Sequence, residues 1–365
     1  MRLLRAAISH FRNLTDVALP LGPGGNLFCG PNGAGKTNLV EALAMGCTGR
    51  PLRANPQRLL VQQGFDTAYT GVMVASEQLG ELRAEVTLPK AGARTYVLNS
   101  EPSSKADFVT TFPVLVFYEE DLENVRGAAS RRRSFLNLHL AQTSRQYYSQ
   151  LSAYSRALAQ RNALLRQYDE NPVLFEPWER QMATTGATIV EQRRSFVDEL
   201  APRVVRYSEL LRVGAPVSVE YRPNVKSKGD QTEAIMTALR ESRELDMRLR
   251  FSTTGPHRDD LVLKLADAPM RHFASAGQQR LFALALKLAA GELLAARREE
   301  SPLVVLDEAF AQLDQYRAGA LVEALSQFDQ WLATAALGSL IPEAARAGAT
   351  RFDVHEGEVD ADGQA

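Results

Sequence analysis

The sequence predicts an α/β protein whose head is built from both ends of the chain, with a mainly helical lobe inserted between them. Segments with the apolar or alternating pattern of strands lie at residues 2–9, 15–21, 26–29, 69–99, 112–117, 217–221, 250–252, 261–265, 302–306 and 331–334. Helical spacing of apolar residues marks 130–168, 178–211, 231–248 and 277–298, the first two being separated by Asn171-Pro172. We therefore expect a discontinuous head of residues 1–120 and 250–365, and an arm lobe of residues 121–249 with two long antiparallel helices.

Composition narrows the class of protein. The 365 residues are 45% hydrophobic and 23% charged, and a net charge of −1 gives no global attraction to nucleic acid, so any such case must rest on local patches. The two cysteines, Cys29 and Cys47, have no metal-binding spacing. No signal peptide and no apolar run of roughly 20 residues is visible, so we expect a cytoplasmic protein with no membrane partner. The acidic residues 356–365 are expected to fray.

A glycine-rich loop follows the apolar segment Asn26–Cys29 and precedes a helical pattern. It fits the phosphate-loop pattern G-x-x-x-x-G-K-[ST] with the residues Gly30, Pro31, Asn32, Gly33, Ala34, Gly35, Lys36 and Thr37. Its backbone N–H groups and the following helix N-terminus suit a nucleotide phosphate. Lys36 is expected to reach the β- and γ-phosphates of ATP, and Thr37 to ligate Mg²⁺. The alternative is a glycine-rich turn with a chance lysine.

A second motif is the apolar run Leu303–Leu306, which ends at Asp307 and Glu308. An acid at the carboxyl end of a buried strand lies beside the phosphate loop in doubly wound sheets. Asp307 is expected to hold Mg²⁺, and Glu308 to polarise the attacking water as a catalytic general base. The alternative is a strand that ends at a solvated acidic turn.

A third motif, Ala274–Gln279, precedes the helical pattern at 277–298. It resembles the signature motif of ABC-type ATPases, with Ser275, Gly277 and Gln278 matched and Ala276 departing from the pattern. In that family the motif caps ATP bound to a second subunit, so the resemblance implies an ATP-dependent homodimer. Asp314 resembles the D-loop acid that faces the dimer partner. The alternatives are a helix N-cap at Ser275 and a surface acid at Asp314 that opens the next helix.

The whole arm separates Thr37 from Ser275, an insertion that is typical of the chromosome-associated branch of ABC-type ATPases and not of transporters. Within this branch the chain resembles the RecF family. The matching segments are His10–Leu14, Gly30–Ala42, Gly49–Arg53, Val116–Leu122, Arg131–Leu136, Tyr154–Leu165 and Thr254–Leu261. Glu119 stands in place of the usual Pro beside Glu120, and Asn137 in place of an Asp. The segment His257–Asp259 reads from the residues alone as a hydrogen-bonded turn before a strand, and no catalytic role for His257 is indicated.

The RecF resemblance implies an ATP-driven dimer that clamps duplex DNA near single-strand gaps or junctions. It further implies action with RecO and RecR, assistance to RecA loading and SOS induction. Residues 126–212 hold fourteen arginines against eight acidic residues, and arginine suits phosphate contacts. The expected DNA-binding residues are Arg50, Arg53, Arg131, Arg132 and Arg133. Alternatively, Arg131–Arg133 form a solvated helix face or pair with the acids of 119–123.

Two other functions compete with this interpretation. A transporter ATPase subunit is disfavoured by the large insertion and by the Thr254–Leu261 segment. A structural chromosome organiser, or a nuclease-linked head, would need a long coiled coil, a hinge or a further domain, and strict heptads do not persist in the arm.

Slow ATP turnover is the first testable expectation. The switch histidine of ABC-type ATPases is absent near residues 331–336, where Thr334 or Ser339 stands instead. Because this histidine is missing, we expect a weak, DNA-stimulated ATPase that acts as a switch. Steady-state phosphate release measures this, and fast hydrolysis without DNA would contradict it.

Overall fold

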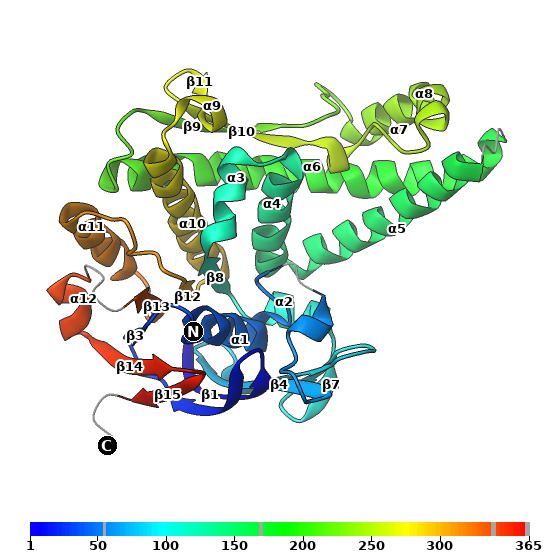
Figure 1. Cartoon of the computed structure of the whole chain (residues 1–365). Helices are drawn as coiled ribbons and strands as arrows, with labels where there is room; N and C mark the ends of the chain where they lie inside the picture. The colour runs from blue at the N-terminus through cyan, green and yellow to red at the C-terminus, as the bar shows by residue number, and fades with distance from the viewer. Residues whose placement is uncertain (54–55, 168–170, 337–340, 362–365) are drawn as a thin grey trace. The chain divides into compact units, whose positions relative to one another are not determined.

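The computed structural model describes residues 1–53, 56–167, 171–336 and 341–361 (Figure 1). The chain divides into two compact units. The first consists of Met1–Asp121, Tyr207–Gly214 and Arg280–Ala365, and the second of Leu122–Arg206 and Ala215–Gln279. The expected head included residues 250–279, whereas the structure places them in the second unit, because strand β10 (Asp260–Leu265) pairs along its whole length with β9 (Val217–Arg222).

The first unit contains a six-stranded, mainly parallel sheet that positions the glycine-rich loop. Its order is β15 (Glu358–Ala361), β14 (Ala349–His355), β3 (Gly25–Gly30), β13 (Trp331–Ala336), β12 (Leu303–Leu306) and β8 (Val114–Phe117). All neighbouring pairs are parallel except β14 with β15. Both β3 and β12 are buried along their whole length, which explains the uninterrupted apolar sequence of β12 and the mainly apolar sequence of β3. The carboxyl ends of β3, β12 and β13 therefore meet at one edge of the sheet.

A second, antiparallel sheet belongs to the same unit. Its order is β2 (Leu14–Pro20), β1 (Arg2–Phe11), β4 (Thr67–Ser76), β5 (Gly80–Pro89), β6 (Thr95–Leu98) and β7 (Glu101–Ser103). Buried and exposed residues alternate along β2 and β5, as expected for a sheet with one face on the core.

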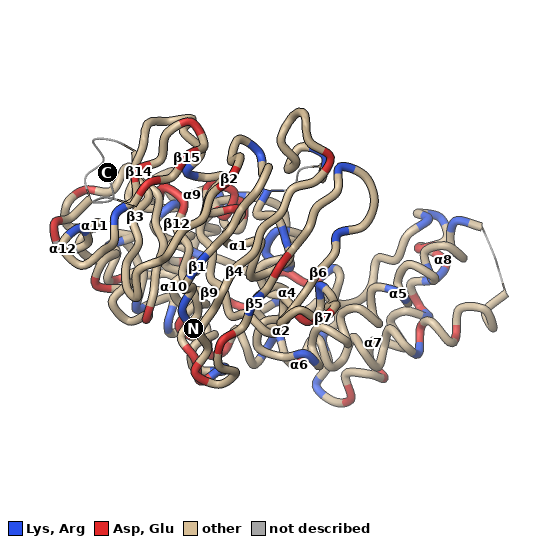
Figure 2. The backbone as a smooth tube through the Cα atoms, turned by 90° about the horizontal axis from the view of Figure 1, so that it is seen from below, with Lys and Arg blue, Asp and Glu red and all other residues tan. Residues whose placement is uncertain are grey.

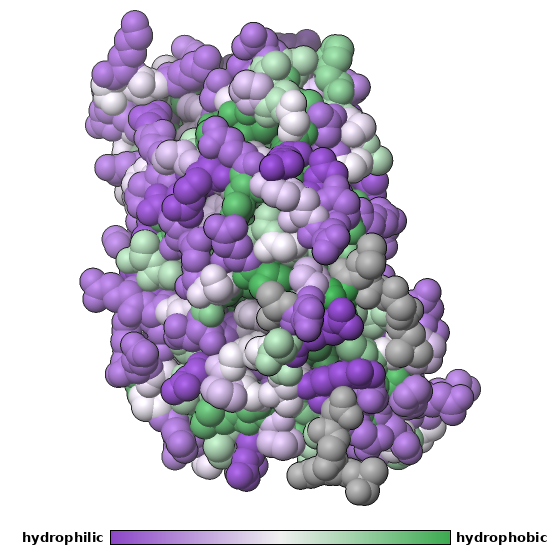
Figure 3. All heavy atoms as spheres, turned by 90° about the vertical axis from the view of Figure 1, so that its left-hand side faces the viewer, coloured by the Kyte–Doolittle hydropathy of each residue, from purple (hydrophilic) through white to green (hydrophobic). Residues whose placement is uncertain are grey.

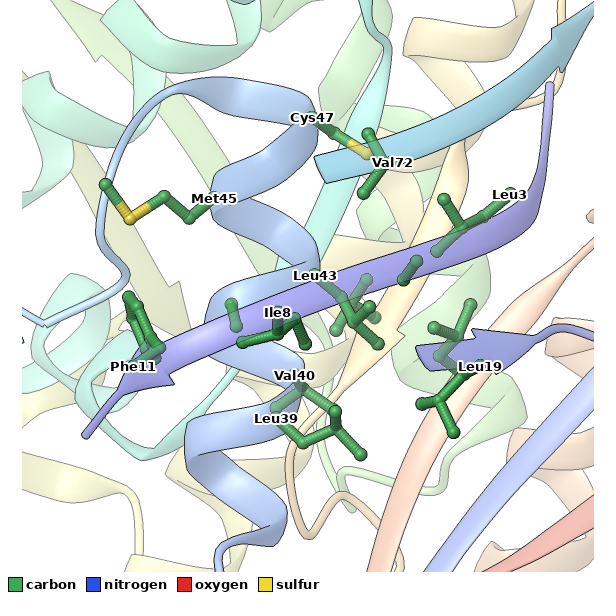
Figure 4. Packing of buried hydrophobic residues seen from close by; sticks show 14 of the residues in the cluster. Leu3, Ile8, Phe11, Leu19, Leu39, Val40, Leu43, Met45, Cys47 and Val72 are labelled. Carbon is green, nitrogen blue, oxygen red and sulfur yellow. The ribbon is translucent and has the colours of Figure 1, made fainter. Parts of the chain in front are cut away.

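Helix α1 (Lys36–Thr48) joins the two sheets into one core. Leu39, Val40 and Leu43 are fully buried in a cluster that includes Ile8 of β1 (Figure 4). Phe28 of β3 belongs to the same cluster. Each such side chain contributes about 1.5–3 kcal/mol through burial. Because α1 is covered on nearly all sides, its sequence is apolar almost all round and only weakly amphipathic.

Further helices complete the first unit. They are η1 (Gln57–Leu59), α2 (Lys105–Thr111), η2 (Glu119–Leu122), α10 (Ala276–Arg298), α11 (Gln315–Leu325) and α12 (Glu343–Ala347). The division between the units falls after the first turn of α10.

The second unit is mainly helical. Its elements are α3 (Glu123–Arg126), α4 (Ala129–Thr143), α5 (Arg145–Gln167), α6 (Pro172–Leu210), α7 (Gln231–Glu241), α8 (Arg243–Leu249), η3 (Pro256–Arg258), α9 (Met270–Phe273) and a sheet of β11 (Ala268–Pro269), β10 and β9. Helix α5 carries four arginines and no acidic residue, whereas α8 carries both signs (Figure 2).

Four sequence-based expectations are wrong in detail. The run 130–168 is two helices, because the chain is extended at Ser144, and 231–248 breaks at Ser242. Residues 250–252 form no strand, since Arg250 takes a left-handed conformation with φ 62°. The acidic end does not fray over residues 358–361, which pair with β14; residues 362–365 lie outside the described part.

Among the described residues, no helix is both long and apolar enough to span a bilayer. On the face shown in Figure 3, hydrophilic residues predominate and apolar ones occupy separate small areas.

A buried ion cluster holds the helices of the second unit together. The guanidinium of Arg161 on α5 is fully buried and donates to Glu179 of α6 at 3.1 Å and to Asp246 of α8 at 2.6 Å. It also donates to Ser252 Oγ at 2.8 Å and to the main-chain oxygen of Leu239 at 2.9 Å. One side chain thus joins α5 to α6 and to the stretch from Leu239 to Ser252.

Replacing Arg161 by Met is expected to lower the free energy of unfolding by about 3–5 kcal/mol, because Glu179 and Asp246 would lose their buried counter-charge. Urea denaturation followed by circular dichroism measures the loss. Arg156→Met, at an exposed position of the same helix, is the control. Equal midpoints for the two variants would show that the cluster is not needed for stability.

Candidate nucleotide-binding site

The glycine-rich loop runs from the end of β3 at Gly30 to the start of α1 at Lys36. Gly35 has φ 115°, a conformation that side chains rarely tolerate, and a Cβ there would lie 2.8 Å from Asn13 Nδ2. A Cβ on Gly30 would lie 2.2 Å from the main-chain oxygen of Val354 in β14. Glycine is therefore required at both positions by close backbone packing and by chain conformation.

The helix start behind the loop is open to an anion. Helix α1 has no side-chain cap and no acidic residue in its first turn, so its N–H groups and dipole remain available. The Lys36 ammonium donates to the main-chain oxygens of Gly30 and Pro31, each at 2.9 Å. This places the cation within the loop, where a triphosphate would compete for it.

Three oxygen-bearing side chains meet at the sheet edge. Asp307 Oδ1, just after β12, accepts from the hydroxyl of Thr37 at 3.1 Å and from that of Thr334 at 2.7 Å. Burial raises the pKa of Asp307, while the hydrogen bonds from Thr334 and Thr37 oppose the rise. A carboxylate and a hydroxyl at this separation fit two adjacent ligands of Mg²⁺, which prefers oxygen at about 2.0–2.1 Å.

Glu308 is held by its backbone. It has φ 49°, a left-handed conformation that is costly for a residue with a side chain. Its N–H donates to Thr334 Oγ1 at 2.8 Å, and its main-chain oxygen accepts from Arg280 Nη2 at 2.7 Å. Thr334 thus contacts both Asp307 and Glu308, and its role as a switch residue stays a prediction. Ser339, the other candidate, lies outside the described residues. Arg280 was not expected, since no local motif marks it.

The turn between β14 and β15 also lies against the loop. The N–H of Gly357 and the side-chain amide of Asn13 both donate to the main-chain oxygen of Ala34, at 2.8 and 3.2 Å. A cavity of about 570 Å³ is lined by Pro31–Ala34 of the loop and by His355, Glu356 and Glu358 of the turn. Sequence reasoning missed these residues because it expected the acidic end to fray.

The signature-like and D-loop-like residues both act as helix caps. Ser275 N donates to Gln278 Oε1 at 2.9 Å, and Gln278 N donates to Ser275 Oγ at 3.3 Å, while Ser275 and Gly277 are exposed. Asp314 caps α11 by accepting from the N–H of Arg317 at 2.8 Å, a contact that chiefly lowers the pKa of Asp314. Both N-cap alternatives are therefore present, and contact with a second subunit stays a prediction for these residues.

The two expected DNA-binding arginines after α1 differ. Arg50 is exposed. The guanidinium of Arg53 is paired with the fully buried carboxylate of Glu41 at 2.6 Å, and Arg12 pairs with the same carboxylate at 2.7 Å. Arg53 also donates to Asn38 at 2.8 Å. The charge of Arg53 thus balances a buried carboxylate, and contact of Arg53 with DNA stays a prediction.

The three consecutive arginines of α4 also differ in exposure and in their partners. Arg131 is exposed. The buried Arg132 forms a bidentate ion pair with Asp260 at 2.7 and 3.1 Å, so Arg132 as a DNA contact is corrected. Arg133 is half-buried and donates to the main-chain oxygen of Asp259 at 2.8 Å. The alternative pairing with the acids of 119–123 is likewise replaced for Arg132 by the pair with Asp260.

The Thr254–Leu261 segment is hydrogen-bonded to several other segments of the second unit. The carboxylate of Asp259 accepts from Arg193 at 2.7 Å, from Asn224 N at 2.8 Å and from the hydroxyl of Tyr221. His257 is bonded at both ring nitrogens, by the Tyr154 hydroxyl at 2.6 Å and by the main-chain oxygen of Ser252 at 3.0 Å. The ring therefore carries its proton on Nε2, and burial lowers the pKa of His257 to about 4.

A pH effect on stability follows from His257. Its pKa falls from an ordinary 6.5 to about 4 on folding, so between these values the unfolded chain binds a proton that the folded chain refuses. The free energy of unfolding should fall by about 3 kcal/mol as pH drops through this window. Urea denaturation of wild type and His257→Gln at several pH values measures it. The idea fails if both proteins lose stability equally over this range.

Comparison with known proteins places these observations in context. A family model described as the RecF/RecN/SMC N terminal domain matches residues 2–349. The DNA replication and repair protein RecF of Streptomyces avermitilis is 32% identical over 99% of this chain and 100% of its own length. Its counterpart in Acidothermus cellulolyticus is 34% identical over 98% of this chain and 99% of its own.

Solved structures give the same result. One described as the recombination mediator protein RecF with ATP in the RecFOR pathway is 26% identical, with a TM-score of 0.89 over 98% of this chain and 97% of that one. The Smc head domain of Pyrococcus furiosus, at 14% identity over 98% of this chain and 95% of its own, shares the fold alone with a TM-score of 0.57.

Proposed function

The chain belongs to the RecF family, and we propose that it is an ATP-dependent DNA-binding protein of recombinational repair and replication restart. The predicted fold class, an ABC-type ATPase head with an inserted helical part, is confirmed by the likeness to the RecF structures. ATP binding by this chain is supported by the glycine-rich loop and by the open start of α1.

The observation that carries the proposal is the meeting of Thr37, Asp307, Thr334 and Glu308 at one sheet edge. Lys36 and the loop N–H groups would bind the phosphates, and Thr37 with Asp307 would hold Mg²⁺. ATP would supply the phosphoryl group, and Mg²⁺ would neutralise the negative charge of the phosphates. Glu308 would take a proton from the attacking water, with its backbone fixed by Thr334 and Arg280. Thr334 in place of a switch histidine favours slow hydrolysis.

The second part of the proposal is an ATP-dependent homodimer. Ser275, Gly277 and Asp314 are exposed, and Gln278 is hydrogen-bonded to Ser275, so these residues would be accessible to the nucleotide face of a second copy. Closure of this dimer would clamp duplex DNA near single-strand gaps or junctions. Action with RecR and RecO, assistance to RecA loading and SOS induction belong to the same proposal.

Of the five expected arginines, DNA contact would use Arg50, Arg131 and Arg133, because Arg53 and Arg132 are engaged by the carboxylates of Glu41 and Asp260. Arginine forks suit phosphate oxygens, and these contacts would be sensitive to salt.

A structural chromosome organiser is the second candidate, favoured by the fold shared with Smc heads. It carries less weight, since RecF proteins match this chain over nearly their full length whereas the Smc likeness is one of fold alone. A transporter subunit finds no support among these likenesses.

The test is a Glu308→Gln variant, which should bind ATP and not hydrolyse it. Light scattering with ATP, Mg²⁺ and duplex DNA should show a doubling of mass relative to the nucleotide-free protein, and the dimer should persist longer than in wild type. Glu323→Gln, at an exposed position on α11, is the matched control and should behave as wild type. A Glu308→Gln protein that stays monomeric under all these conditions would defeat the clamp.

A further inference from the structure

A cavity of about 270 Å³ in the second unit lies beside the Thr254–Leu261 segment. Its walls come from α4, α5 and α6, which are labelled in Figure 1, and from η3. The polar lining residues include Ser130, Arg133 and Ser134 of α4, Ser155 of α5, Arg193 of α6 and His257. None of the described lining residues is acidic, so hydrogen-bond donors and positive charge dominate the walls.

The nearby carboxylates are engaged by other cations. Asp260 is taken by Arg132, and Asp259 by Arg193. Arg133 meets a main-chain oxygen through one of its nitrogens, although a guanidinium carries five N–H groups. Burial lowers the pKa of Arg133, and Arg193 and Arg258 lower it further, while Asp260 and Asp259 oppose the shift without reversing it.

Helix α4 adds to this imbalance. It begins after Ala128 with no side-chain cap and no acidic residue in its first turn, yet places Arg131, Arg132 and Arg133 near its N-terminus. Cations at that end oppose the helix dipole, whereas an anion is favoured there. An anion bound beside Ser130 and Arg133 would relieve a repulsion that the protein otherwise carries.

We propose that this cavity is a phosphate-binding site of the DNA interface, in which Arg133 and the hydroxyls of Ser130 and Ser134 hold one phosphate group of a nucleic acid. The neutral ring of His257 lines the cavity and is held by hydrogen bonds at both of its nitrogens. Arg193, which also lines the cavity, is held in place by its ion pair with Asp259. This inference rests on the proposed DNA binding and adds the place and chemistry of one contact. The phosphate could lie within a strand or at a strand end, since both present the same oxygens.

The test measures duplex binding by the full chain with ATP over a range of salt concentrations. Arg133→Gln and Ser134→Asp should each weaken binding about five- to tenfold and reduce the salt slope by about 1. Ser134→Ala, which adds no charge, should have a smaller effect, and Arg156→Gln on an exposed part of α5 should have none. Thermal unfolding checks that each variant folds; if Arg133→Gln does not, the exposed Ser134 still decides the question.

Binding to duplexes with and without a 5′-phosphate distinguishes a phosphate within a strand from one at a strand end. An equal loss on both supports a phosphate within a strand, and a loss confined to the phosphorylated duplex supports a strand end. If wild type binds DNA and folded Ser134→Asp binds equally well with the same slope, the cavity is not a phosphate site, and the proposed function stands. If wild type binds no DNA under any of these conditions, the proposed function fails and this inference fails with it.

Discussion

The hydrogen bond between Thr37 and Asp307 joins residues that are 270 positions apart, and the first unit depends on the geometry that permits it. It forms only when β3 and β12 lie on either side of β13 with parallel direction, so that their carboxyl ends share an edge. The same arrangement brings Thr334 from β13 to the carboxylate and orients Glu308 behind it. Sheet topology, more than any local turn, therefore assembles the candidate hydrolytic site.

The second unit is stabilised by a different means. Arg132, Arg161 and Arg193 each lie within the protein and each meets an acidic side chain from a distant segment. Such pairs are strongly directional, and removing one partner leaves a buried charge, so they define one arrangement of the helices. They account for three of the fourteen arginines of residues 126–212. Nine others are exposed, namely Arg126, Arg131, Arg145, Arg156, Arg166, Arg180, Arg194, Arg206 and Arg212, so this part of the chain combines internal ion pairs with many cations at its surface.

Sequence was sufficient where the information is local or the pattern strong. The loop Gly30–Thr37 is contiguous, and the apolar run before Asp307 marks a buried strand without knowledge of its neighbours. It failed where a long-range partner decides the role of a residue. Arg131 and Arg132 are adjacent and chemically identical, yet only Arg132 faces Asp260, which lies 128 residues further on. Likewise, Arg53 forms an ion pair with Glu41. Residues 358–361, which were expected to fray, form strand β15 and pair with β14.

The hydrogen bond from Gly357 to Ala34 has a consequence for biosynthesis. The glycine-rich loop is translated well before its flanking strands β13 and β14 and the turn that meets it, because these follow the loop in the sequence. Because β3 sits between these two strands, the loop has no finished support until more than 300 further residues have followed it. The second unit, whose segments all precede β12, is complete in sequence before that point. In a nascent chain the helical second unit can therefore form before the strands that support the glycine-rich loop have been made.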